Sequence, residues 1–165
     1  STGELTRIFR QYGELRNAGA LASAIVQARA EAPLKRTSDL EKALLRFIPK
    51  NHPSKFLARV YQALRIEVNQ EMESLGEMLL QTAGLMNPKG RLVVITYHSV
   101  EDRLVKNFMR NGCFESKQEK DLYGNILRPL DPVNNKVIVP GDEEIANNNR
   151  ARSARLRIAE KPIHA

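Results

Sequence analysis

The densest group of side chains that could carry chemistry runs from His98 to Arg103 and directly follows a short apolar run at 92–95. In an open α/β sheet, ligands bind at the carboxyl ends of the strands, so His98 and Ser99 stand where a pocket would form. A Ser-His-Asp hydrolase fits poorly, because adjacent residues leave a strand on opposite sides and no G-x-S-x-G elbow surrounds the serine. The structural alternative is that Ser99 and Asp102 cap the following helix and His98 only packs.

A second group is the arginine cluster at 150–157, which holds four arginines and no acid. Each guanidinium placed on a nucleic-acid phosphate releases counterions, so Arg150 and Arg152 are candidates for phosphate contacts. The alternative for these two is an ion pair with Glu143 or Glu144. Further along, Arg155 and Arg157 share one face of a predicted strand, as on an ordinary amphipathic edge strand.

The composition narrows the class of protein. The chain has 165 residues, with 26 Lys plus Arg against 19 Asp plus Glu, a net charge of +7 and a pI near 9.8. A nucleic-acid partner would explain this excess, and so would the alternative of a merely solvated surface. No apolar run approaches the roughly 18 residues of a membrane span, so no membrane association is expected.

The cysteine and histidine content predicts neither a disulfide framework nor a metal site. Cys113 is the single cysteine, which fits a reducing cytoplasm, and we expect its thiol to be inert. The three histidines, His52, His98 and His164, are scattered without zinc-ligand spacing.

The elements of the first half are predicted to be helices. Ser1 with Glu4 reads as a capping box opening a helix that Gly13 closes, and Ser38 with Glu41 reads as a second box before Pro49. Between them a helix is expected over 14–32. A long amphipathic run over 55–85 exceeds an average helix, so we expect a bend near Asn69.

The spacing of apolar residues is no longer helical just after residue 87. The turn at 87–90 precedes the β-branched run 92–95, which predicts a central strand buried on both faces, and a helix follows it. Polar, turn-rich sequence over 110–135 predicts surface loops, and two further strand candidates lie at 137–139 and 154–159. The whole predicts an α/β fold.

The sequence offers too few strand candidates for a complete sheet. A strand buried on both faces needs neighbours on both edges, and a doubly wound sheet has about five or six strands. The nine glycines never form G-x-G, so no nucleotide-cradling loop is present. We therefore expect the parallel half of the sheet to lie outside this chain, and the unpaired edge of the Leu92–Ile95 strand to pair with another copy or be covered by helices.

Three ordered blocks carry a specific resemblance. They are Tyr61–Asn69, Pro88–Lys106 and Asn148–Arg157, which resemble F-Q-A-L-R-I-x-V-N, G-G-R-L-x-V-I-S-F-H-S-L-E-D-R-x-V-K and N-P-R-A-R-S-A-K-L-R. These patterns are typical of the bacterial 16S ribosomal RNA cytosine-N4 methyltransferases of the MraW/RsmH type. Departures are mild, such as Thr96-Tyr97 in place of Ser-Phe and Asn149 in place of proline.

The resemblance implies a partial class I, Rossmann-like methyltransferase sheet plus an inserted all-α helical domain. It implies an inserted substrate-recognition domain at 1–66 and the last part of the methyltransferase domain at 67–165. The family's S-adenosylmethionine residues precede the matching region, so no cofactor-binding residue is expected here and this chain alone is expected to be inactive. The chain is then a fragment of an enzyme acting on N4 of a cytidine in 16S ribosomal RNA of the small subunit.

The resemblance also suggests roles for individual residues. His98 and Ser99 are expected to line the cytidine pocket, while Arg150, Arg152 and Arg155 are expected to contact RNA. The runner-up is a non-catalytic helical RNA-binding module, which leaves the 92–95 strand unexplained.

Overall fold

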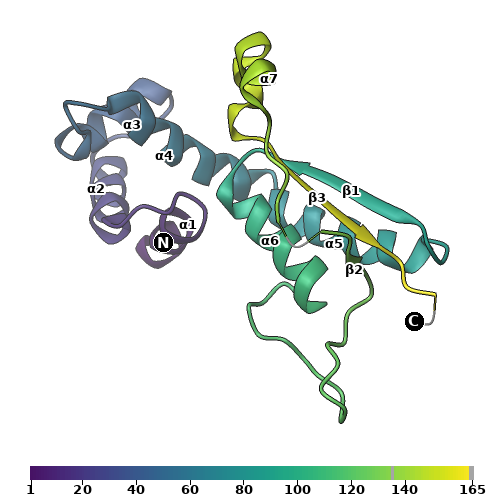
Figure 1. The fold of residues 1–165 in the computed structure, drawn as a ribbon. Coiled ribbons are helices and arrows are strands. Elements are labelled where there is room, and N and C mark those ends of the chain that lie inside the picture. The colour runs from purple at the N-terminus through teal and green to yellow at the C-terminus, as the bar shows by residue number, and fades with distance from the viewer. Residues whose placement is uncertain (135, 164–165) are drawn as a thin grey trace. The chain divides into compact units, whose positions relative to one another are not determined.

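The structure is a computed structural model that describes residues 1–134 and 136–163. Figure 1 labels the helices and strands along the chain, coloured from the N-terminus to the C-terminus. The chain divides into two compact units, residues 1–71 and the described residues from Met72 onward, and each is described by itself.

The first unit is helical. Its elements are α1 (Thr2–Gln11), α2 (Ala18–Glu31), α3 (Thr37–Leu44), the 3-10 turn η1 (Leu45–Phe47) and α4 (Pro53–Val68). Their apolar faces meet in a mainly aliphatic core that includes the fully buried side chains of Phe9, Leu21, Leu44, Val60 and Ile66. Burial of a side chain of this size contributes about 1.5–3 kcal/mol, so this core holds the helices together.

The helix starts of this unit confirm one prediction and correct two. Ser1 and Glu4 form the predicted capping box. The second helix begins at Ala18 rather than at residue 14, because Glu14 has a φ of 50°, outside the helical region. The box predicted for Ser38 and Glu41 is wrong. Asp39 closes that helix start instead, where its carboxylate accepts from the backbone N–H groups of Lys35 and Arg36.

The long amphipathic run over 55–85 is interrupted near Asn69, where a bend was expected. The helix α4 ends at Val68, and α5 (Glu71–Leu85) begins after a turn in which Gln70 has a φ of 51°. A non-glycine residue in the left-handed region ends a helix, so the predicted bend near Asn69 is a full interruption.

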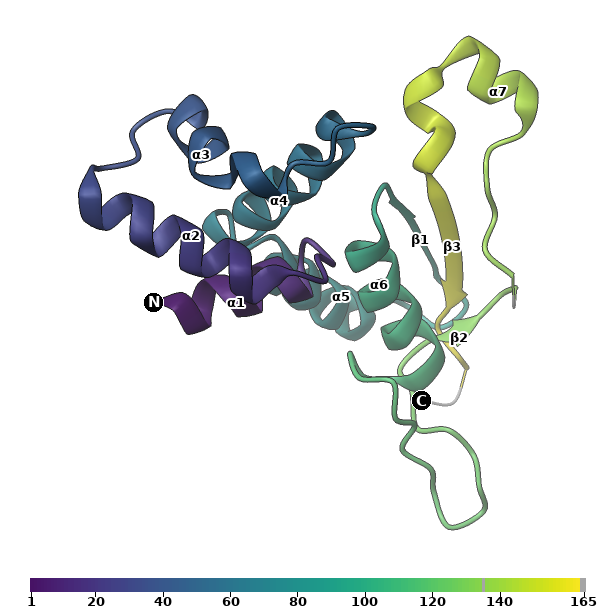
Figure 2. The same ribbon diagram turned by 90° about the vertical axis from the view of Figure 1, so that its left-hand side faces the viewer.

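The second unit packs helices against a three-stranded sheet (Figure 2). It contains α5 from Met72, β1 (Arg91–Thr96), α6 (Ser99–Asn111), β2 (Asp131–Pro132), α7 (Asp142–Asn147), the 3-10 turn η2 (Asn149–Ser153) and β3 (Arg155–Glu160). The strand order is β1-β3-β2, and β3 runs antiparallel to both neighbours, with Val93 opposite Ile158. The core includes the fully buried Leu79, Phe108 and Leu130.

The structure corrects the prediction of a central strand buried on both faces. Within the described residues β1 lies at the end of the sheet, and its exposure alternates. Leu92 and Val94 pack on the core, whereas Val93 and Ile95 are 53% and 52% exposed. A run of consecutive β-branched residues looks the same whichever face is covered, so the sequence pattern alone could not separate the two arrangements.

The two remaining strand predictions had different outcomes. The strand predicted at 154–159 is β3, placed between β1 and β2 rather than at an edge. The strand predicted at 137–139 is wrong, because only Ile138 forms an isolated bridge, to Leu156. The strand that pairs with β3 farther along the same edge, opposite Glu160 and Ala159, is Asp131–Pro132, two residue types that are rare in strands and so gave no signal.

At a coarse level the predicted α/β class is confirmed, since the described residues form seven α-helices and this one layer of strands. None of the described helices is both long enough and apolar enough to cross a bilayer.

Candidate functional site

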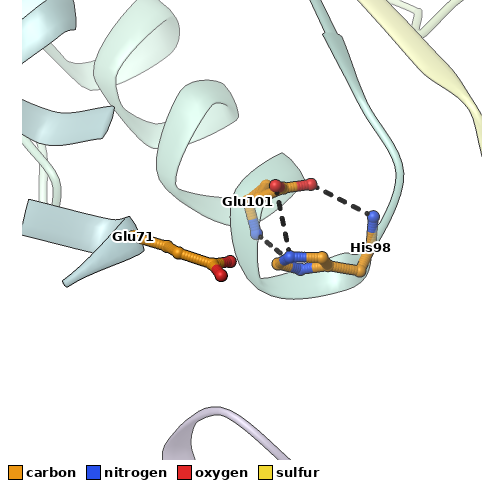
Figure 3. A group of neighbouring side chains, drawn as sticks. All are labelled: Glu71, His98 and Glu101. Carbon is orange, nitrogen blue, oxygen red and sulfur yellow. Dashed lines mark hydrogen bonds and ion pairs between the residues drawn. The ribbon is translucent and has the colours of Figure 1, made fainter. Parts of the chain in front are cut away.

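The turn between β1 and α6 holds His98 at the helix start. His98 is the N-cap residue, and its Nδ1 accepts from the backbone N–H of Glu101 at 3.3 Å. In return, the Glu101 carboxylate accepts from the N–H groups of Tyr97 and His98 at 3.1 and 3.4 Å. Figure 3 shows the His98 ring and the Glu101 side chain locked together at the first turn of α6.

This reciprocal arrangement corrects the capping role predicted for Ser99 and Asp102. Ser99 is the first residue of α6 rather than its cap, and the helix start is closed by His98 and Glu101 one residue earlier. Burial works to raise the pKa of Glu101, but the His98 ring and the two backbone N–H donors outweigh it, and the pKa is lowered. Glu101 therefore stays ionised against the positive end of α6.

The hydrogen bond from the N–H of Glu101 also indicates which ring nitrogen of a neutral His98 carries the proton. A ring nitrogen that accepts a hydrogen bond carries no proton, so the proton of neutral His98 lies on Nε2. That atom is buried and lies 3.2 Å from a carboxylate oxygen of Glu101, but without hydrogen-bond geometry. The ring is thus positioned by its own helix turn.

Asp102 is buried and joins α6 to β3. Its carboxylate accepts a bidentate pair from Arg157, at 2.7 and 3.1 Å, and a further hydrogen bond from Nη1 of Arg155 at 2.9 Å. Burial works to raise the pKa of Asp102, but the two guanidinium groups outweigh it and hold the pKa below 3.8. The ion-paired Asp102 therefore fixes the arginine face of β3 beside the β1–α6 turn.

A polar pocket lies at this junction, with a volume of about 420 Å³. It is lined by Tyr97, His98, Ser99, Val139, Arg152, Ser153, Ala154 and Arg155. The structure thus brings together four of the five residues singled out in the sequence, from segments about 50 positions apart. The volume lies within the range of small-molecule sites and exceeds what an ordered water needs.

The arginines occupy different positions around it. Arg152 is exposed on η2 and lines the pocket, while Arg155 is about half exposed and is held by Asp102. Arg150 is exposed on η2 but is not a lining residue. Among the described residues neither Arg150 nor Arg152 forms an ion pair, so the alternative of a bridge to Glu143 or Glu144 is not supported.

Two features of this site were missed in the sequence. Tyr97 is 56% exposed at the pocket, and its place beside His98 at the strand end was the available signal. The pairing of Asp102 with Arg155 and Arg157 was missed because Asp102 was assigned to capping. No local pattern links residues 53 and 55 positions apart.

Comparison with known proteins decides the family. A profile of the MraW methylase family matches residues 1–162. The chain belongs to this family. Proteins named Ribosomal RNA small subunit methyltransferase H are similar to it: the one from Flavobacterium johnsoniae is 53% identical over 158 residues, and that from Parabacteroides distasonis 54% over 157. These alignments cover 96% and 95% of this chain.

The same alignments cover 52% of each relative, so the chain spans about half the length of the curated relatives it matches. The predicted family is confirmed. The pocket between β1, α6 and η2 lies within the matched region.

Proposed function

We propose that this chain is the substrate-binding half of an S-adenosylmethionine-dependent methyltransferase that acts on N4 of a cytidine in 16S ribosomal RNA. The observation that carries the proposal is the pocket that gathers His98, Ser99, Arg152 and Arg155 in a chain of the MraW methylase family. In this proposal residues 1–66 are the inserted recognition domain, whose basic surface enlarges the RNA footprint, and the enzyme works in the cytoplasm.

The pocket suits a nucleotide taken out of its stack. Enzymes that modify a base extrude it into a pocket and read it by stacking and by hydrogen bonds to its edge. The half-exposed ring of Tyr97 offers a stacking surface, and Ser99 lines the pocket beside it. Arg152 and Arg155 add positive charge for the flanking phosphates, and Arg150 lies on the same η2 turn.

His98 acts in this proposal as a positioning residue. Its Nδ1 is already used by the N–H of Glu101, so it is not available to accept a proton from the cytosine amine. The ring instead holds the β1–α6 turn in the shape that presents Tyr97 and Ser99. The amine lone pair of cytosine is delocalised into the ring. N4 must therefore be aligned accurately with the methyl carbon, and a rigid turn at the pocket supports this alignment.

The described residues do not fit the methyl donor. A cofactor of this kind is usually held at a glycine-rich turn before a helix N-terminus. The turn between β1 and α6 has no glycine, and the N–H groups of Tyr97, His98 and Glu101 are already used by the Glu101 carboxylate and the His98 ring. We therefore assign no cofactor contact to this chain and place the donor on the half of the enzyme that the chain does not cover.

The edge of β1 is where we propose that this other half joins. Within the described residues β1 has a strand on one side only, and Val93 and Ile95 expose apolar side chains. An uncovered strand edge with an apolar face is a ready template for pairing. In the absence of the other half, we expect the chain to associate with a second copy through β1, which sedimentation analysis would reveal as a concentration-dependent dimer.

The proposal is tested by extending the chain to the full length of its relatives and measuring methyl transfer to small-subunit particles. We expect N4-methylcytidine as the product, detected by mass spectrometry of the digested RNA. Arg152→Gln should raise KM about tenfold with little change in kcat, because it removes binding that is equal in ground and transition states. Lys120→Gln, an exposed cation outside the pocket, is the matched control.

The outcomes separate the two functions considered for this sequence. A full-length protein that binds S-adenosylmethionine and forms N4-methylcytidine supports the proposal. A protein that binds RNA but never methylates it would favour the non-catalytic RNA-binding module. Unchanged KM in Arg152→Gln would remove that arginine from the substrate site.

A further inference from the structure

A second cavity lies in the same unit, toward the other end of α6. It has a volume of only about 20 Å³ and lies where α6, β2, β3 and the segment after β2 meet. Its lining residues are Lys106, Met109, Arg110, Pro132, Asn134, Lys136, Arg157 and Ile158. The lining thus holds four cationic side chains and no carboxylate, and it shares no residue with the His98 pocket.

The positive charge at this cavity is not compensated within the described part of the chain. There, Lys106, Arg110 and Lys136 form no ion pair. Arg157 is paired with Asp102, but that carboxylate is shared with Arg155.

The carboxylate next to the lining is also occupied. Asp131 precedes the lining residue Pro132, and Nε of Arg128 holds it at 2.7 Å. Asp131 is therefore neutralised by Arg128, and the single charge of Asp102 is divided between Arg155 and Arg157. An excess of positive charge remains around a small concave surface, which favours an anion there.

The size of the cavity limits what can enter. About 20 Å³ accommodates one water-sized group, which excludes a base or a nucleotide and admits an oxygen of a larger anion. A phosphodiester presents two such oxygens at its surface, and Arg and Lys are the side chains that bind them. An RNA backbone therefore fits both the charge and the volume.

We propose that Lys106, Arg110 and Lys136 form a seat for a backbone phosphate of the RNA, and we call these three residues the phosphate seat. This proposal rests on the proposed function, since it assumes an RNA substrate, and it adds a contact site apart from the cytidine pocket. From Ser99 to Arg110 the helix rises on the order of 15 Å, so one RNA strand lying along α6 reaches both sites.

The test measures binding of the chain to two fluorescent single-stranded RNA oligonucleotides at several KCl concentrations. One carries the small-subunit sequence around the target cytidine and the other has an unrelated sequence. Each of Lys106→Gln, Arg110→Gln and Lys136→Gln should lower the slope of log K against log salt by about 0.7, and the triple variant by about 2. The triple variant should bind about tenfold more weakly at low salt, and equally so for both sequences, because phosphates carry no sequence information.

Matched controls separate the seat from general effects. Lys120→Gln removes an exposed cation elsewhere in the unit and should leave the slope within about 0.3 of wild type. Arg110 also stabilises the negative end of α6, so each variant is checked by circular dichroism, which should show unchanged helix content.

Each outcome bears on the seat. A triple variant with wild-type affinity and salt slope overturns the seat and leaves the proposed function standing, since methylation is measured separately. A loss confined to the target sequence overturns the phosphate assignment. A wild-type chain that binds neither RNA overturns the seat together with RNA binding by this half of the enzyme, whereas the absence of N4-methylcytidine overturns only the proposed chemistry.

Discussion

The two units use charge in different ways. In the helical unit the ion pairs lie at the surface: Arg7 meets Glu67 at 2.6 Å, with 47% and 34% of their side chains exposed. In the sheet unit Asp102 is 6% exposed and Arg157 15%, and they join a helix to a strand. Exposed pairs contribute about 0–1 kcal/mol, whereas a buried charge left without its partner is costly. The helices therefore depend on apolar packing, and the sheet unit depends in addition on one buried ionic junction.

The largest effect is expected at this junction. Asp102→Asn removes the charge that two arginines share and leaves the largely buried Arg157 without a counterion. We expect the free energy of unfolding to fall by about 3 kcal/mol, measured by urea denaturation. A loss below 1 kcal/mol would mean that the junction behaves like an exposed pair and that the contrast between the units does not hold.

Acidification should reach the same junction. The pKa values of Asp102 and Glu101 are lowered from 3.8 and 4.5, so both groups stabilise the fold above about pH 4.5. This stability is lost as the pH falls through the lower pKa values of the folded state, because the unfolded chain binds more protons there. The unfolding free energy of wild type should therefore fall more steeply below pH 4.5 than that of Asp102→Asn. Parallel curves would contradict the shifted pKa of Asp102.

An intermediate effect is expected at the cap of α6. His98→Ala removes the acceptor for the N–H of Glu101 and should cost about 1 kcal/mol in unfolding free energy. His98→Asn is the matched control, because asparagine is among the preferred N-cap residues and should restore most of the loss. If both variants lose the same stability, the ring matters through packing rather than through its hydrogen bond.

The smallest effect is expected at the surface of the helical unit. Glu67→Gln breaks the pair with Arg7 and should change the unfolding free energy by less than about 0.5 kcal/mol, with still less effect in 0.5 M KCl. A loss comparable to that of Asp102→Asn would show that exposure does not explain the difference between the two units.

Much of the helical unit could be predicted because its signals are local. The capping box of Ser1 needs only Glu4 three residues on, and the interruption at Asn69 follows from a run too long for one helix. The errors were local as well. Asp39, Ser38 and Thr37 are all plausible at a helix start, and only the observed hydrogen bonds show that Asp39 closes it.

The sheet unit was harder to predict because its decisive contacts are distant in sequence. The strands β1 and β3 and the polar turn at His98 follow from sequence patterns, and Arg152 and Arg155 stand out in their basic cluster. That these residues line one pocket is a property of the folded unit. Which face of β1 is covered, and how many residues of each later segment pair with β3, depend on the packing of the folded unit.

The sequence by itself determined the family, through three ordered blocks that survive mild substitutions, and most of the helices, through apolar spacing and caps. Only the tertiary structure decided what His98 and Asp102 do. A histidine and an aspartate at a helix start have several possible partners of similar energy. His98 takes Glu101 in its own turn, whereas the partners of Asp102 depend on where β3 brings Arg155 and Arg157, across 53 and 55 positions of chain.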